Sequence, residues 1–311
     1  MPKLSIIINA YNVEQYIQQA VDSVLGQSFD DFEVILIDDK STDKTREIIT
    51  NIRDSRVVKF LQTRNMGLGA GRNFGIDHAK GEYVMFLDGD DILEEDILSQ
   101  VASNLRDDTD LYIYNYVRFY PDGTNEKSQL GGEPNQMYVG ATNKVYASGV
   151  INGVRFAENT YFEDTSFALL AYLNARKVAF FEESLFMYRQ GRVGQITKGA
   201  DSARHLGVLN GLNDVMNLAL SGTIKNKKII QVINFEHFNH AFMAFIANDE
   251  AAEENATKIV NSQRRLNGPI VEYSDSILIT IKDSLFMWLL SHKFFRVARL
   301  LGKVILNVRH S

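Results

Sequence analysis

The chain has 311 residues, of which 45% are hydrophobic and 23% charged, a composition typical of globular proteins with a sizeable core. Its 33 Lys and Arg stand against 39 Asp and Glu, and the net charge of −6 argues against nucleic acid as a general partner. The chain contains no cysteine, which excludes disulfides and thiolate metal sites and fits a reducing compartment.

The N-terminal stretch MPKLSIIINAYN lacks the basic and long apolar regions of a secretory signal. No uncharged apolar run approaches the roughly 18 residues that a membrane-spanning helix needs. We therefore expect a cytoplasmic protein. The C-terminal segment, considered below, adds the option that it contacts the inner face of the cell membrane.

The first hundred residues alternate strand and helix patterns. Short β-branched or apolar runs predict strands at 4–9, 33–38, 57–61 and 83–88. Helical spacing or capping residues predict helices at 13–25, 41–54 and 69–81. Strands that alternate with helices in this way predict an α/β fold, with a mostly parallel, Rossmann-like sheet flanked by helices.

The pattern changes after residue 110. Residues 110–120 alternate as a strand does, and residues 122–134 are rich in turn-forming residues and predict a loop. Residues 163–175 predict a helix that carries Glu163 and Asp164 in its first turn. From residue 201 onward helical patterns dominate. We expect a catalytic domain at 1–200 and a helical C-terminal region at 201–311, although a helical extension packed on the first domain would show the same pattern.

Two common nucleotide-binding motifs are absent. A dinucleotide fingerprint belongs on the turn after the first strand, where this chain reads NAYNVE, without glycine. The glycines of GLGAGRNFG (67–75) have other spacings and follow the third strand, and no G-x-x-x-x-G-K-[ST] occurs.

Acidic residues instead follow the predicted strands. Asp38 and Asp39 end one strand, and FLDGDD (86–91) ends another with Asp88, Asp90 and Asp91. Ligands of open α/β sheets bind outside these strand ends. Carboxylates there can accept hydrogen bonds from a base or ribose, or ligate a hard cation such as Mg²⁺ or Mn²⁺. The spacing of Asp88 and Asp90 predicts a site for a metal-bridged diphosphate.

The motifs together resemble one enzyme family. SIIINAYN, DDKSTDKT, RNMGLGAGRNFGIDHAKGEY, FLDGDD, YFEDTSF and LFMYRQGRVGQIT occur in an order and spacing similar to those of the family 2, GT-A-fold glycosyltransferases of bacterial surface-polysaccharide synthesis. The resemblance covers about residues 3–200. The Q-x-x-R-W signature of processive members is absent, which favours transfer of a single sugar, and Gly194-Gln195-Ile196-Thr197 stands where Gly-Ser-Ile-Thr is commoner.

The resemblance implies roles for individual residues. Ala10, Tyr11 and Asp39 would contact the uracil of a UDP-sugar, Asp88 the ribose, and Asp90 the metal. Asp164 would be the catalytic base, with Glu163 beside it near the acceptor. The implied donor-binding set also includes Asn12, Asn65, Gly67, Arg72, Gly89, Arg189 and Arg192.

Structural alternatives stay open for several of these residues. Asp39 could cap the helix that follows it, and Glu163 and Asp164 could serve the helix dipole. Arg189 and Arg192 could be solvated, or could close over the diphosphate together with Lys198 in a mobile segment. Asp91 is interpreted as charge at the start of a helix. His237 and His240 are interpreted as packing residues.

The predicted function is an inverting, divalent-metal-dependent transfer of a sugar from a UDP-sugar to a hydroxyl of a growing surface glycan. The acceptor would be a glycan or lipid-linked glycan of capsule, teichoic acid or lipopolysaccharide type. Two alternatives remain: a non-catalytic assembly partner with the same fold, and a sugar-phosphate nucleotidyltransferase, against which the glycine-free turn NAYNVE argues.

The last thirty residues, 282–311, differ from the rest. They hold six basic residues and one acidic residue, a net charge of +5, so the other 281 residues carry −11. Their spacing is typical of a cationic helix that contacts anionic headgroups. The alternative is a helix packed on the acidic catalytic domain or on another subunit, which would make the protein a homo-oligomer.

Overall fold

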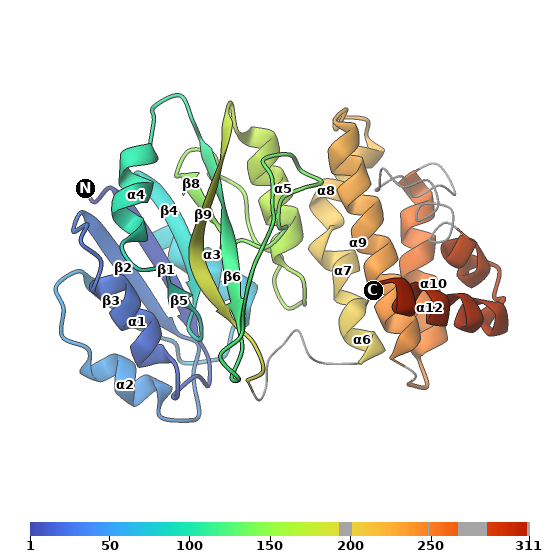
Figure 1. Ribbon diagram of the computed structural model, residues 1–311, viewed down its shortest axis with the longest axis horizontal. Coiled ribbons are helices and arrows are strands. Elements are labelled where there is room, and N and C mark those ends of the chain that lie inside the picture. Colours follow the sequence, from blue (N-terminus) through green and yellow to red (C-terminus); the bar gives the residue numbers. More distant parts are fainter. Residues whose placement is uncertain (193–200, 248, 267–284, 310–311) are drawn as a thin grey trace. The chain divides into compact units, whose positions relative to one another are not determined.

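The computed structural model describes residues 1–192, 201–247, 249–266 and 285–309. The chain forms two compact units, which are described separately. The first comprises Met1–Gly132, Gln136–Asn159 and Phe167–Gln195, and the second comprises Glu133–Asn135, Thr160–Ser166 and Ile196–Ser311. Figure 1 shows the strands in the first unit and the long helices in the second.

The first unit is built on a sheet with strand order β3-β2-β1-β4-β8-β6-β9-β5, and β7 pairs with β6. Its first four strands are parallel, as their apolar runs predict, and their bounds agree closely with the predictions. They are β1 (Leu4–Ala10), β2 (Phe32–Asp38), β3 (Val57–Leu61) and β4 (Tyr83–Asp88). Every residue of β1 and β2 is buried, which explains why these strands show no polar alternation.

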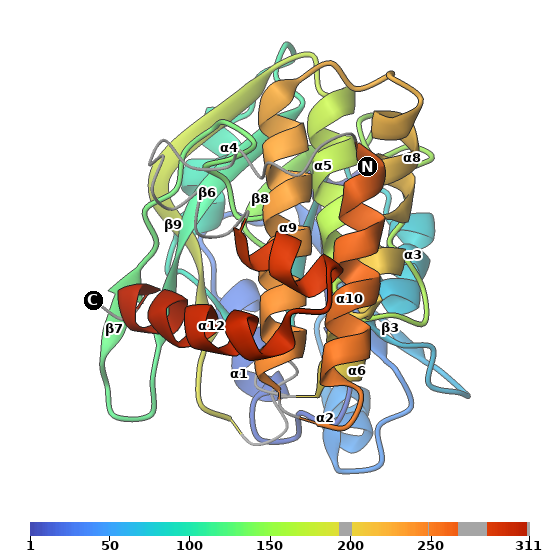
Figure 2. The same cartoon turned by 90° about the vertical axis from the view of Figure 1, so that its right-hand side faces the viewer.

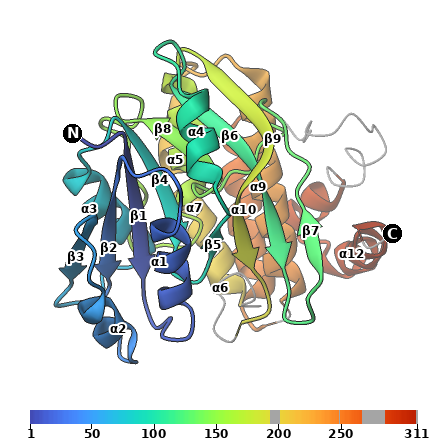
Figure 3. The same ribbon diagram turned by 60° about the vertical axis from the view of Figure 1, so that its left-hand side comes forward.

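Helices cover both faces of this parallel half (Figure 3). One face packs Leu4, Ile6 and Ile8 against α1, α2 and α4 in a single apolar cluster. On the other face α3 lies so close that a Cβ on Gly75 would come within 2.4 Å of the Ile7 side chain. The helices are α1 (Ile17–Leu25), α2 (Thr45–Asn51), α3 (Leu68–His78), α4 (Ile97–Asn104) and α5 (Asp164–Asn174), whose first turn belongs to the second unit.

The remainder of the sheet is mixed. The strands are β5 (Ile92–Leu93), β6 (Leu111–Phe119), β7 (Asn125–Lys127), β8 (Lys144–Ala147) and β9 (Val178–Arg189). β6 is parallel to β9, and the other pairings are antiparallel. The predicted loop at 122–134 is therefore partly wrong, because β7 pairs with β6 there. All three residues of β7 are exposed, so no apolar pattern marks this strand.

The second unit is helical where it is described after residue 201, as predicted. Its elements are α6 (Ser202–His205), α7 (Gly207–Gly211), α8 (Asn213–Leu220), α9 (Lys227–Ile246), α10 (Ala252–Gln263), the 3₁₀ turn Arg264–Leu266 and α12 (Phe295–Arg309). In Figure 2, α9 and α10 lie side by side and α12 crosses α9. None of the helices in the described ranges is long and apolar enough to cross a membrane.

Two buried histidines make the stability of this unit depend on pH. Burial lowers the pKa of both His205 and His237 to about 4, against an ordinary value of 6.5. The fold therefore favours the neutral rings, so their contribution to stability is complete above pH 6.5 and is lost as pH falls toward 4. We expect the urea midpoint to fall between pH 7 and pH 5, and His237→Gln to flatten that dependence. An equal flattening by substitution of the exposed His78 would contradict this.

Candidate functional site

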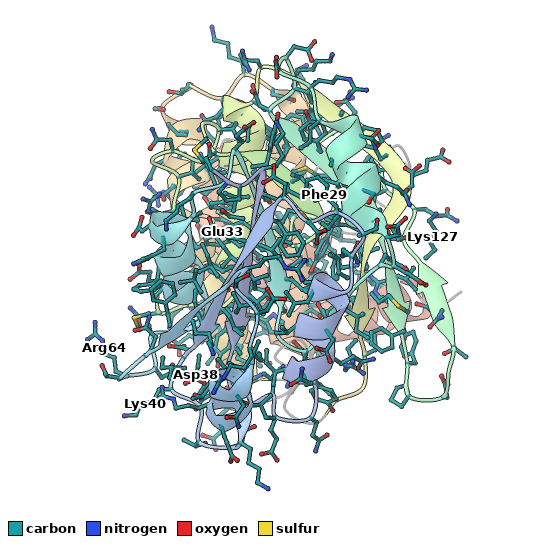
Figure 4. The ribbon with its side chains drawn as sticks, turned by 90° about the vertical axis from the view of Figure 1, so that its left-hand side faces the viewer. Phe29, Glu33, Asp38, Lys40, Arg64 and Lys127 are labelled. Carbon is teal, nitrogen blue, oxygen red and sulfur yellow. The ribbon has the colours of Figure 1, made fainter. Side chains whose placement is uncertain are left out.

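The parallel half of the sheet brings the predicted donor-binding residues of the first unit to one edge. The strand register pairs Ala10 with Asp38 and Asn9 with Asp88. Figure 4 shows Asp38, Lys40 and Arg64 near one end of these strands, and Glu33, at the start of β2, away from them. Residues separated by up to about 80 positions therefore meet at the carboxyl ends of β1, β2 and β4, where open α/β sheets bind ligands.

Asp39 joins the segment after β2 to the start of α3. Its two carboxylate oxygens accept the backbone N–H groups of Met66 and Gly67 at 2.7 and 2.8 Å, and Asn65 donates its side-chain amide to the Asp39 carbonyl at 3.1 Å. Burial is the main cause that raises the pKa of Asp39. Asp39 therefore does not cap α2, the helix that follows it, which was the alternative drawn from the sequence. Its carboxylate instead fixes the loop that precedes α3. Its predicted contact with uracil stays a prediction.

The segment after β1 lies beside this loop. The backbone N–H of Asp39 donates to the Ala10 carbonyl at 2.9 Å. Asn12, at a positive φ of 52°, receives the backbone N–H of Thr42 on its side-chain oxygen at 2.8 Å. Tyr11 is 47% exposed, so its aromatic side chain is accessible to a ligand.

Arg72 and Asp88 form an ion pair at this edge. The guanidinium of Arg72 lies 2.8 Å from the Asp88 carboxylate, with the Arg72 side chain 4% exposed and that of Asp88 30% exposed. Arg72 also lies over the ring of Phe156, 5.3 Å from its centroid. The arginine is buried because α3 carries glycines on the face that meets the sheet, including Gly71 and Gly75.

Removing the arginine should destabilise the first unit. We expect Arg72→Ala to lower the free energy of unfolding by about 2–4 kcal/mol, less than the full cost of breaking a buried pair because water reaches Asp88. The matched control is Arg155→Ala, which breaks a pair with Asp77 of the same 2.8 Å length but with both side chains exposed; there we expect at most about 1 kcal/mol. Urea unfolding measures both, and equal losses would contradict the assignment.

Asp90 lies at the centre of the acidic cluster. It is only 9% exposed, its carboxylate pairs with Arg192, and the Arg189 side chain donates to its backbone carbonyl at 2.7 Å. Burial raises the pKa of Asp90, Arg192 lowers it, and the neighbouring Asp88 raises it further. The positive charge that the clustered carboxylates require is therefore supplied in part by an arginine 102 residues later in the chain.

Gly89 allows the Asp88–Asp90 segment to lie against β1. Its backbone N–H donates to the Asn9 carbonyl at 3.1 Å. A Cβ at this position would lie 3.1 Å from that same oxygen and 3.2 Å from the Cβ of Ala10. Glycine thus allows this close approach of two backbones without a shift of the neighbouring atoms.

Asp91 corrects an interpretation made from the sequence. It does not begin a helix: β5 follows it, and α4 begins at Ile97. Asp91 is 1% exposed and accepts the backbone N–H of Arg189 at 2.9 Å. Burial and the adjacent carboxylates raise its pKa well above the ordinary value. Asp91 therefore joins β9 to the acidic cluster.

Arg189 occupies a fixed position at the end of β9. Its guanidinium lies over the rings of Tyr16 and Phe119, 4.6 and 4.5 Å from their centroids, and donates to the Gln19 side chain at 2.8 Å. These contacts show that Arg189 is not simply a solvated residue, and its closure over the diphosphate stays a prediction. Lys198, predicted to act with it, falls outside the described residues.

The acidic cluster has the donor chemistry that a divalent cation needs. Its carboxylate oxygens are hard ligands. Burial raises the pKa of Asp90 and Asp91, because a buried negative charge is costly unless a cation offsets it. Within the described ranges, no group of three or more acidic, histidine or cysteine side chains converges to hold a metal. A cation on Asp90 would therefore take its other ligands from phosphate oxygens and water, as Mg²⁺ and Mn²⁺ commonly do.

Glu163 and Asp164 belong to the second unit. Asp164 is the first residue of α5, in the first turn as predicted, whereas Glu163 lies immediately before the helix and is 6% exposed. Phe162 next to them stacks on His205, with ring centroids 5.7 Å apart. The prediction that this acidic pair acts together with Asp90 stays a prediction.

Two residues of this edge were not predicted. Arg46 donates to Asp38 at 2.6 Å, so the wholly buried Asp38 has a structural partner. Asn9 is 8% exposed, and its side-chain oxygen has no hydrogen-bond partner among the described residues. This oxygen faces Gly71 of α3: a Cβ built on Gly71 would lie only 2.4 Å from it, so a larger residue at position 71 would clash with Asn9. The sequence did contain one indication that Asn9 is functional: it is a polar residue that directly follows the apolar run Ile6–Ile8.

Comparisons with known proteins agree with this arrangement. The description "Glycosyl transferase family 2" matches residues 5–162, about half of the chain. A curated relative, the putative glycosyltransferase EpsH of Bacillus subtilis, is 32% identical over 210 residues, which cover 60% of this chain and 61% of that protein. The chain thus matches less than two thirds of that relative's length.

A second relative is known in sequence and in structure. The poly(ribitol-phosphate) β-N-acetylglucosaminyltransferase TarS of Staphylococcus aureus is 29% identical over 218 residues, covering 63% of this chain and 37% of TarS. The crystal structure of TarS residues 1–349 with UDP-GlcNAc has a TM-score of 0.75 at 18% identity, over 98% of this chain and 92% of that one. At this identity the likeness shows the shared fold.

A more distant structure is that of the mannosyltransferase PcManGT from Pyrobaculum calidifontis, in complex with GDP-Man and Mn²⁺. Its TM-score is 0.55 at 13% identity, over 97% of this chain and 84% of that one. The matched family region contains the parallel strands and the acidic cluster at their ends, and the fold is that of TarS. The chain belongs to glycosyl transferase family 2.

Proposed function

We propose that this chain transfers a sugar from a UDP-sugar to a hydroxyl of a growing surface glycan, with inversion and with the help of Mn²⁺ or Mg²⁺. The observation that carries the proposal is the cluster at the carboxyl end of β4, where Asp88 and Asp90 are paired with Arg72 and Arg192. Two acidic and two basic side chains at one sheet edge suit a donor that has both a ribose and a diphosphate.

The donor would lie along the strand ends. Tyr11 is exposed for contact with the base, and the loop fixed by Asp39 would border the base pocket. Asp88, with its carboxylate 30% exposed, can accept a hydrogen bond from a ribose hydroxyl while it keeps Arg72. The choice of a uridine nucleotide is supported by the UDP-GlcNAc bound to TarS, which has the same fold.

Asp90 would hold the divalent cation, which neutralises charge on the leaving diphosphate when it is bound. For this to occur Arg192 must release the Asp90 carboxylate, and phosphate oxygens provide an equivalent partner for its guanidinium. The Arg189 contact to the Asp90 carbonyl holds the backbone of the cluster in place. Support for Mn²⁺ comes from the complex of PcManGT, a structure of related fold.

Asp164 would act as the base. In the reaction the acceptor oxygen forms a bond to the anomeric carbon, the bond from that carbon to the phosphate oxygen breaks, and the hydroxyl proton passes to the Asp164 carboxylate. Glu163 would help to place the acceptor. Support for a polymer of the cell envelope as acceptor comes from TarS, a poly(ribitol-phosphate) β-N-acetylglucosaminyltransferase.

The test is the release of UDP from a panel of UDP-sugars, including UDP-GlcNAc, UDP-GalNAc, UDP-glucose and UDP-galactose, with Mn²⁺ or with EDTA. We expect one of these donors to be hydrolysed slowly and only with the metal, since water can replace the acceptor. Absence of turnover together with absence of nucleotide binding would overturn the proposal and favour a non-catalytic assembly partner.

A further inference from the structure

The end of the chain carries an exposed apolar surface. Trp288, Phe294, Val297 and Leu300 have exposed fractions of 44%, 50%, 51% and 67%, and Leu285 is also exposed. The rings of Trp288 and Phe294 stack with their centroids 5.7 Å apart. We call these five residues the C-terminal apolar face. Other exposed large apolar residues in the described ranges, such as Val58, Leu220 and Met243, come from separate elements.

This face is distinct from the side chains of the same segment, 285–309, that pack within the second unit. Phe286 is fully buried and contacts Phe242 and Phe245, with ring centroids 5.3 and 5.7 Å apart. In α12, Ala298 and Gly302 are buried. Within the described part of the second unit, these buried residues provide the packing contacts, and the C-terminal apolar face consists of other residues.

Basic residues border the face, and acidic residues do not occur in its part of the sequence. Lys293 and Arg296 are exposed next to Phe294 and Val297. Arg299 pairs with Glu253 at 2.9 Å. From residue 284 to the end of the chain there is no Asp or Glu, whereas the chain as a whole has a net charge of −6.

We propose that the C-terminal apolar face docks on the surface of a membrane that contains anionic lipids. Exposed aliphatic and aromatic side chains can enter the headgroup region, a tryptophan is favoured at that depth, and Lys293 and Arg296 can reach lipid phosphates. The charge is complementary to such a surface, and no helix of the described ranges spans a membrane, so the contact is peripheral. The proposal rests on the second unit alone and does not depend on the proposed sugar transfer.

The test uses the full-length chain, whose single tryptophan is Trp288. Vesicles of equimolar phosphatidylcholine and phosphatidylglycerol should pellet the protein and shift its tryptophan emission to shorter wavelength, and vesicles of phosphatidylcholine alone should do so much less. Lys293→Glu/Arg296→Glu should weaken binding by at least roughly 30-fold, because each basic residue near an anionic surface contributes about fivefold. High salt should weaken binding in the same direction.

Matched control variants distinguish an effect of the C-terminal apolar face from an effect of net charge or of exposed apolar residues in general. Lys225→Glu/Lys227→Glu changes the net charge equally at two exposed lysines, and Leu220→Ser removes an exposed apolar side chain elsewhere; both should bind as the unchanged protein does. Phe294→Ser/Leu300→Ser should lose vesicle binding and keep the thermal midpoint and any UDP-sugar hydrolysis.

Three results would overturn the proposal: an emission spectrum unchanged by anionic vesicles, equal binding by both charge-reversal variants, or vesicle-independent dimers that Phe294→Ser/Leu300→Ser dissociates. The last result would assign the face to a second copy of the chain. Vesicle binding without UDP-sugar turnover would leave the docking face intact and count against the proposed function only.

Discussion

Asp90→Asn is expected to lower the rate of UDP release by roughly 10²–10³-fold, because the loss of cation binding removes several kcal/mol of stabilisation from the leaving diphosphate. The amide keeps the size of the side chain and can still accept a hydrogen bond from Arg192, which pairs with the Asp90 carboxylate. The fold should therefore survive while metal dependence disappears. The measurement is the rate of UDP release as a function of Mn²⁺ concentration.

The matched control is Asp91→Asn. It makes the same chemical change one residue later, at a carboxylate that accepts a backbone N–H from Arg189, a contact that an asparagine oxygen can keep. The pKa of Asp91 is already raised well above its ordinary value by burial, so loss of the charge should matter little. A comparable loss of rate and of metal dependence in both variants would show that the cluster acts through its total charge and that Asp90 has no special role.

Asp164→Asn is expected to reduce sugar transfer by about 10²–10⁴-fold, the range typical for loss of a general base. Asparagine is tolerated at the start of a helix, so the stability of α5 should change little. Donor binding should also be unchanged, because the proposed donor residues all lie in the first unit. Rates of transfer to an acceptor glycan and the dissociation constant of the UDP-sugar give the two readouts.

A structural role for Asp164 makes a different prediction. If the carboxylate only serves the dipole of α5, the substitution would lower the thermal midpoint and leave the transfer rate per folded molecule unchanged. Glu163→Gln provides the comparison: Glu163 is 6% exposed, and we expect this change to affect acceptor affinity more than the maximal rate.

The parallel half of the fold was predictable because its strands are short, largely apolar runs between helical patterns. β1 and β2 are buried along their whole length, and β3 and β4 have the bounds that the sequence predicts. The mixed half was harder to predict, because the exposed β7 and the short β5 and β8 have no distinctive pattern. Pairings such as Ile92 with Met187 join residues too far apart in sequence for local rules.

The same limit applies to the candidate site. The sequence pointed to Asp88 and Asp90 because clustered carboxylates after a buried strand require a positive partner. It did not show which basic residue pairs with which carboxylate, because Arg72, which pairs with Asp88, comes from α3, and Arg192, which pairs with Asp90, follows β9. Asp91 was misinterpreted because its role depends on Arg189, 98 residues away. Residue types at strand ends predict the chemistry, whereas the contacts between them depend on the tertiary fold.

The central claim is that Asp90 and a divalent cation together hold the diphosphate of a UDP-sugar. Its most direct test is the thermal midpoint of the chain with UDP, measured with and without Mn²⁺, for the unchanged protein and for Asp90→Asn. A ligand that binds the folded state raises the midpoint by mass action. We expect UDP and Mn²⁺ together to raise the midpoint of the unchanged protein more than either alone, and Asp90→Asn to abolish this cooperation. An equal, metal-independent rise in both proteins would contradict the account.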